Sequence, residues 1–105
     1  MQTEISFIAP TTNADGSVLT EALTFAALID TVNPPVKSYA VPADATVTSG
    51  TVTATFAQLG FTPVNGTTYY VDVIATDASG SSQPSGEVTF IYAVPPSAPT
   101  GLKVS

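Results

Sequence analysis

Alternation of apolar and polar residues along most of the chain predicts β-strands. It is clearest in Thr51–Phe56, Tyr69–Ala75 and Glu87–Ala93, where every second residue is apolar. Thr3–Ala9 shows the same pattern. Val36–Val41 predicts a short strand at a sheet edge, because prolines lie on both sides of it. Clusters of Pro, Gly, Asn, Asp and Ser separate these segments, as expected for turns and loops.

Leu19–Asp30 fits two different predictions. Some of its apolar residues recur at helical spacing, and its Ala and Leu residues favour a helix. Another set, from Leu23 to Ile29, alternates as in a strand. We predict a strand, because every other segment of the chain is predicted to be β.

The strand pattern predicts an all-β fold, an antiparallel β-sandwich of about seven strands. Residues 1–93 are expected to form the sandwich domain. Residues 94–105 are expected to form a Pro-rich spacer followed by a strand-forming C-terminal tail, in which Leu102 and Val104 alternate with polar residues.

Two segments resemble the fibronectin type III family, which has an immunoglobulin-like sandwich fold. Tyr69–Ala75 and the polar loop Thr76–Ser81 resemble its sixth strand and the loop that follows. Ile5–Thr11 resembles its second strand, with Phe7 where many members carry a tryptophan, and Thr12–Ser17 resembles a loop common among bacterial members.

The resemblance implies roles for four core residues. Tyr69 would be the corner tyrosine, whose hydroxyl bonds to an upstream backbone group. Leu59 would be the apolar residue before that corner, and Val71 and Val73 would continue the core face of the strand.

The order of the segments departs from the family. Pro96–Ser105 resembles the first strand of such a domain, yet it follows the last strand instead of preceding the second. The strand that begins near Thr3 would therefore have an open edge, and open edges recruit strands from other chains. We expect the C-terminal tail of a neighbouring subunit to fill the first-strand position. Donor residues would be Pro96, Pro99, Leu102 and Val104, and the acceptor edge would contain Thr3, Ile5 and Phe7.

Other interpretations of the tail remain open. It would also fit the beginning of a second module or a disordered chain end. Return of the tail to its own domain is harder, because residues 93–100 would span only about 22 Å at about 3.1 Å each, the length of one strand. Delivery to a neighbour needs no such reversal, and we favour it.

Charge and composition exclude several functions. The net charge is −6, with two lysines and no arginine or histidine, so no basic surface is available for nucleic acid or an anionic membrane. The absence of cysteine excludes disulfides and thiolate metal sites. We predict no cofactor.

Catalytic chemistry is also not expected. The eight carboxylates could include an acid–base pair, but so small a domain offers no deep cleft in which to shift a pKa. Asn13–Gly16 resembles part of a calcium loop but fits an Asx-type turn better. Asn65-Gly66-Thr67 matches the glycosylation pattern, and we interpret it as a tight turn.

These observations predict a non-enzymatic structural protein that forms a head-to-tail homo-oligomer through its C-terminal strand. By analogy with fibronectin type III modules on virus particles, we expect a capsid or tail decoration subunit on a phage virion, or a surface filament subunit. A capsid or tail protein is the expected second partner.

The chain as given shows no signal peptide. The alternative is a carbohydrate- or receptor-binding module of a larger secreted protein, with Tyr70 or the Ala78–Pro84 loop contacting ligand.

Overall fold

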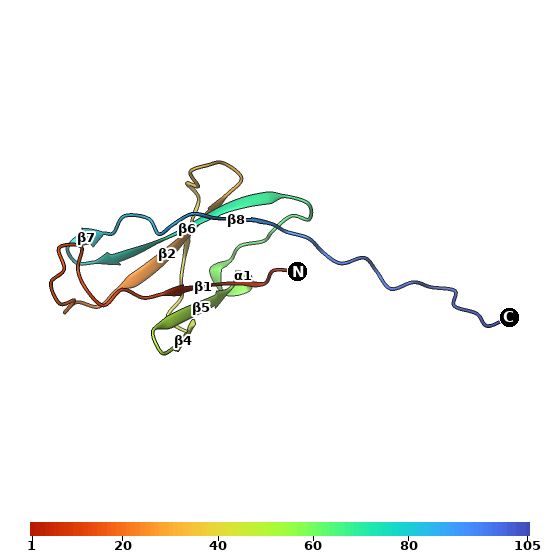
Figure 1. The fold of residues 1–105 in the computed structure, drawn as a ribbon, viewed down its shortest axis with the longest axis horizontal. Coiled ribbons are helices and arrows are strands. Elements are labelled where there is room, and N and C mark those ends of the chain that lie inside the picture. The colour runs from red at the N-terminus through yellow and green to blue at the C-terminus, as the bar shows by residue number, and fades with distance from the viewer.

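The computed structural model describes residues 1–105 and is almost entirely antiparallel β-structure (Figure 1). It confirms the predicted all-β antiparallel sandwich. The elements, in chain order, are β1 (Glu4–Ile8), β2 (Thr24–Asp30), β3 (Ser38–Ala40), β4 (Thr46–Thr48), β5 (Thr51–Thr55), α1 (Phe56–Leu59), β6 (Thr68–Asp77), β7 (Gly80–Ser81) and β8 (Val88–Ile91).

The strands form two sheets. In the first sheet the order is β1-β5-β4, so β1 pairs only with β5 and its other edge is open. In the second sheet the order is β3-β2-β6-β7, and β8 pairs with β6 beside β7. The predicted edge strand within Val36–Val41 is confirmed as β3, which ends the second sheet.

The ambiguous segment Leu19–Asp30 is a strand from Thr24 onward, so the strand prediction is confirmed there. β2 lies between β3 and β6 and pairs with both. Its alternate residues Ala27 and Ile29 are 0% and 1% exposed, which is the alternation expected of a central strand rather than a helical stripe.

A single helical turn, α1, follows β5 and was not predicted. Its boundaries are set by local chemistry. The Gln58 backbone N–H donates to Thr55 Oγ1 (3.1 Å), and the Thr55 backbone N–H donates to Gln58 Oε1 (2.9 Å), which makes a capping box. Gly60 ends the turn in the left-handed region at φ 74°. The short strands β4 and β7 were also not predicted.

The aromatic part of the core lies around α1. Phe56 and Leu59 from α1 are buried there with Phe61 and Tyr69. The ring of Phe61 packs edge-to-face against those of Phe56 and Tyr69, each with centroids 5.1 Å apart. These contacts close one end of the space between the sheets.

The chain leaves the domain after β8. The Tyr92 backbone N–H still donates to the Thr67 carbonyl (3.0 Å), and the Val94 N–H donates to Asn65 Oδ1 (2.9 Å). Beyond this point the tail extends away from the domain, and the molecule measures 71 × 30 × 20 Å (Figure 1). The final strand predicted at Leu102 and Val104 is not formed in the single chain, because no partner strand lies beside it.

Candidate assembly groove

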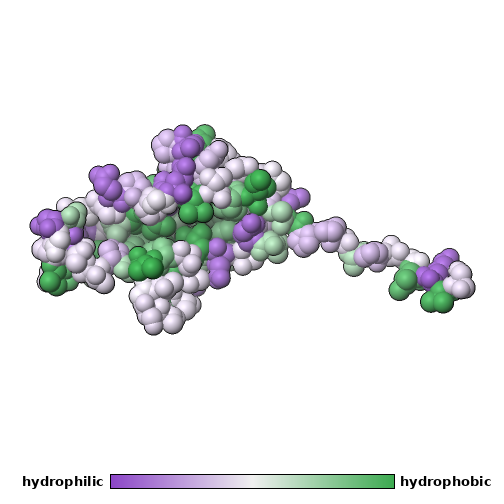
Figure 2. All heavy atoms as spheres, in the orientation of Figure 1, coloured by the Kyte–Doolittle hydropathy of each residue, from purple (hydrophilic) through white to green (hydrophobic).

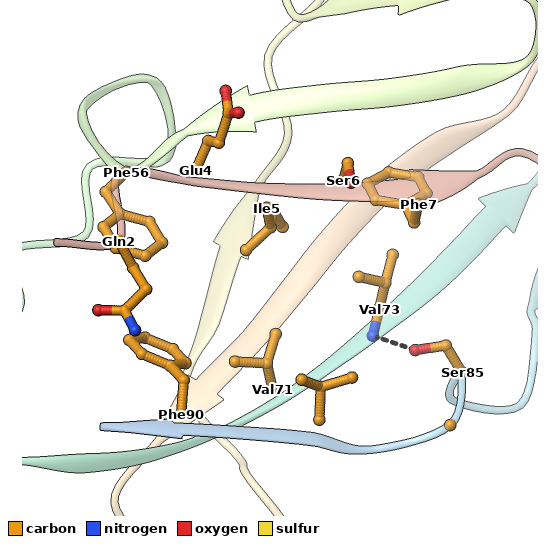
Figure 3. A pocket seen from close by; sticks show the side chains of 12 residues that line it. Gln2, Glu4, Ile5, Ser6, Phe7, Phe56, Val71, Val73, Ser85 and Phe90 are labelled. Atoms are coloured by element: carbon orange, nitrogen blue, oxygen red, sulfur yellow. Dashed lines mark hydrogen bonds between the residues drawn. The ribbon is translucent and has the colours of Figure 1, made fainter. Parts of the chain in front are cut away.

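An apolar groove separates the two sheets along the open edge of β1. Figure 3 shows Ile5 and Phe7 of β1 pointing across it toward Val71 and Val73 of β6. Its volume is about 440 Å³, and Val88 and Phe90 of β8 complete the far wall. We call this space the β1–β8 groove.

The groove continues past the end of β1. A second hollow of about 190 Å³ shares Phe7, Val73 and Ser85 with the first and extends to Ile8, Pro10 and Phe25. The ring of Phe7 packs edge-to-face on that of Phe25, with centroids 5.0 Å apart. Apolar side chains therefore line this side from Phe56 in the first hollow to Pro10 in the second, and Figure 2 shows hydrophobic atoms in the middle of the body.

Not every side chain that faces into the groove is covered. Val88 is paired with Val71 across the strands β8 and β6, so the two side chains lie on the same face of the sheet. Val71 is 8% exposed, whereas Val88 is 63% exposed. An inward-facing valine with this exposure indicates that the layer above it is incomplete.

The open edge of β1 presents backbone groups from alternate residues. The Phe56 N–H donates to the Thr3 carbonyl, and the Ala9 N–H donates to the Gly50 carbonyl, both at 2.9 Å. Odd-numbered residues of this strand therefore direct their backbone groups toward β5. The register of β1 with β5 is continuous from Glu4 to Ile8. The even-numbered residues of β1 therefore direct their backbone N–H and C=O groups to the open edge.

The far wall of the groove is the edge of the second sheet, where β8 pairs only with β6 and its other edge is open. Beyond the end of β8, two serine hydroxyls accept hydrogen bonds from backbone N–H groups of β6. Val73 and Ala75 donate their backbone N–H groups to the hydroxyls of Ser85 (2.9 Å) and Ser82 (3.0 Å). A strand that pairs with the open edge of β1 at this site would pack on β6 and β8.

The predicted donor and acceptor residues lie apart in the single chain. Ile5 and Phe7 are half-buried in the groove, and Thr3 has its carbonyl bonded to α1. The donor residues Pro96, Pro99, Leu102 and Val104 are all exposed in the tail, with Leu102 94% and Val104 99% exposed.

Sequence reasoning missed the second wall of the site, formed by Val88 and Phe90. Their alternation was recognised, and it could have indicated that both point into the same space as Ile5 and Phe7. What the pattern could not show was that this space lacks a cover.

The predicted core residues border the groove and the closed end. Leu59, Tyr69 and Val71 are buried, and Val73 is half-buried in the groove. The Tyr69 hydroxyl accepts a hydrogen bond from the backbone N–H of Val64, five residues upstream, at 2.9 Å. This bond ties the connection after α1 to the beginning of β6.

The acidic residues form no metal-binding cluster. No group of three or more His, Cys, Asp or Glu side chains is placed to hold a metal ion. Asp15 accepts hydrogen bonds from the backbone N–H and the hydroxyl of Ser17, at 2.9 and 2.6 Å, which confirms an Asx-type turn. These bonds lower the pKa of Asp15 below its ordinary value. Asp72 is buried on the opposite face of β6 from the groove.

Comparisons with models of known protein families, with curated proteins and with solved structures find no match to this chain. The chain has no helix of the length and apolar character needed to cross a membrane.

Proposed function

We propose that this protein is a non-enzymatic structural subunit that assembles head to tail, the C-terminal tail of each copy filling the β1–β8 groove of the next. The observation that carries the proposal is the exposure of two complementary surfaces in one chain. Val88 faces inward but is 63% exposed, and Leu102 and Val104 alternate along an extended tail with 94% and 99% exposure. A tail strand in the groove would cover Val88 and would itself bury Leu102 and Val104.

The energetics favour burial of these residues in an assembly. Full burial of a Val or Leu side chain contributes about 1.5–3 kcal/mol. The open edge of β1 adds backbone hydrogen bonds that a tail strand can complete. Loss of the tail should therefore have an effect large enough to measure.

A particle or filament is the setting that we propose for this assembly. A contact between two different surfaces of identical subunits builds a ring if the rotation between subunits closes and an open row if it does not. The resemblance to fibronectin type III modules supports a capsid or tail decoration subunit of a phage, or a surface filament subunit.

Deletion of Pro96–Ser105 tests the proposed function. We expect the full chain to show a mass in solution that rises with concentration, and the deletion variant to stay monomeric with a lower thermal midpoint. The double variant Leu102→Ser/Val104→Ser should behave like the deletion. The matched control is Val36→Ser/Val47→Ser, which changes two valines outside the groove that are 72% and 64% exposed and should leave the mass unchanged.

A full chain that remains monomeric at every concentration, with the same thermal midpoint as the deletion variant, would contradict the proposal. That result would instead favour the ligand-binding module, in which the tail has no partner among copies of the chain.

A further inference from the structure

We infer that the tail of a second copy enters the β1–β8 groove as a strand antiparallel to β1, with Lys103 opposite Glu4, so that all subunits in a row point the same way. This inference rests on the proposed function and specifies its geometry. It names the orientation, the register and the contact residues of the donated strand.

The direction follows from the two ends of the groove. Gln2, Phe56 and Phe90 line one end, and Phe7, Val73 and Ser85 line the other. β1 runs from the first end to the second, whereas β8 runs from the second to the first and continues into the tail. A strand antiparallel to β1 therefore runs in the same direction as the tail of the acceptor subunit (Figure 1).

Because the donated strand and the acceptor's own tail run in the same direction, successive subunits can form a straight row. The donor's tail enters at the Phe7 end of the acceptor, and the acceptor's own tail leaves at the Gln2 end toward the next copy. The span from Ile91 to Leu102 covers about 34 Å at about 3.1 Å per residue. The second hollow, beside Ile8 and Pro10, lies at the entrance, where the Pro-rich spacer would pass.

The register follows from side-chain direction and charge. Directly paired residues of antiparallel strands point to the same face, so Leu102 and Val104 must pair with odd-numbered residues of β1 to enter the groove. Lys103 then pairs with an even-numbered residue, whose backbone groups are directed to the open edge. Glu4 is the only acidic residue of β1, and Lys103 is the only charged residue of the tail.

The resulting contacts use both sides of the tail. Leu102 would pair with Ile5 and lie over the uncovered wall formed by Val88 and Phe90. Lys103 would exchange two backbone hydrogen bonds with Glu4 and place its ammonium group beside that carboxylate.

Engineered cysteines test the register without interference, because the chain has no cysteine of its own. A hydrogen-bonded antiparallel pair has Cα atoms about 5.5 Å apart, within the range of a disulfide. The double variant Glu4→Cys/Lys103→Cys should give, on mild oxidation, a ladder of covalent oligomers on a denaturing gel. Both positions face away from the groove, so the packing is kept.

A second pair of variants tests the orientation. With Lys103 opposite Glu4, an antiparallel strand places Ser105 beside Gln2, whereas a parallel strand places Ser105 beside Ser6. We therefore expect Gln2→Cys/Ser105→Cys to cross-link several-fold more than Ser6→Cys/Ser105→Cys. The reverse ratio would overturn the proposed orientation.

The remaining outcomes separate failure of this geometry from failure of the proposed function. Cross-linking of Ser6→Cys/Lys103→Cys in place of the Glu4 variant would overturn the register, and tail-dependent assembly would still stand. A cross-linked monomer, without a ladder, would show that the tail returns to its own groove and would overturn both. Absence of cross-links in a chain whose mass still depends on the tail would place the tail at another surface.

Discussion

The α1 end of the sandwich and the side along the β1–β8 groove use the same strand pattern but differ in how well their side chains are covered. At the α1 end, Phe56 lies 5.1 Å from the ring of Phe61 and 5.8 Å from that of Phe90, and is 6% exposed. At the groove, Val88 points into the same interior and is 63% exposed. Alternation determines which way a side chain points, and only the neighbouring elements determine whether it is buried.

The difference has a structural cause. The connection from α1 to β6 folds Phe61 under Tyr69 and closes one end of the space between the sheets. Along the groove, the first sheet ends at β1 and no further strand extends over β8. The sandwich is therefore closed at the α1 end and open along the side where β1 and β8 lie.

The largest effect is expected in the closed region. Phe56→Ala removes the ring on which Phe61, Phe90 and Tyr92 pack, and should lower the free energy of unfolding by about 3–5 kcal/mol. Denaturant unfolding of the variant that lacks Pro96–Ser105 would measure this without a contribution from assembly. A loss below about 1 kcal/mol would show that the α1 end does not hold the fold together.

A smaller effect is expected at the hydrogen bond that ties the connection after α1 to the beginning of β6. Tyr69→Phe leaves the N–H of Val64 without its partner and should cost about 1–2 kcal/mol of unfolding free energy. Tyr70→Phe, at the adjacent half-buried position on the outer face, is the matched control and should have little effect. Equal losses in the two variants would argue against a structural role for the hydroxyl of Tyr69.

The smallest effect in the isolated domain is expected at the groove. Val88→Ala should cost less than about 1 kcal/mol when the tail is deleted, because this side chain is 63% exposed. In the full chain at assembling concentrations it should lower the thermal midpoint clearly, since the tail would cover Val88. Ile91→Ala is the matched control on the outer face of β8, with 58% exposure, and its effect should not depend on the tail.

The sequence predicted the strands better than the short elements between them. Val52 and Ala54 alternate with threonines and are buried as expected, because one face of β5 packs on the core. α1 was not predicted, although Thr55 and Gln58 carry the spacing of a capping box, because a single turn has too few residues for a helical period. β4 is fully exposed and polar at two of its three positions, so no alternation identified it.

The candidate site could be predicted only in part. The alternation of Ile5 and Phe7 and the displaced first-strand segment indicated an acceptor edge. The sequence did not show that Val88 and Phe90 form the opposite wall, because this depends on how the two sheets face each other. It also could not show which backbone groups of β1 are free, since that depends on the register with β5.

The positions of the two lysines allow limited proteolysis to report whether the tail is exposed. Trypsin cleaves after lysine and arginine, and this chain offers it only Lys37 and Lys103. Lys37 precedes β3, and its ammonium group lies 5.9 Å from the centre of the Tyr39 ring. Lys103 lies in the extended tail between the two most exposed apolar side chains. The rate of cleavage at Lys103 therefore reports, without any label or substitution, whether the end of the chain is free or held by another surface.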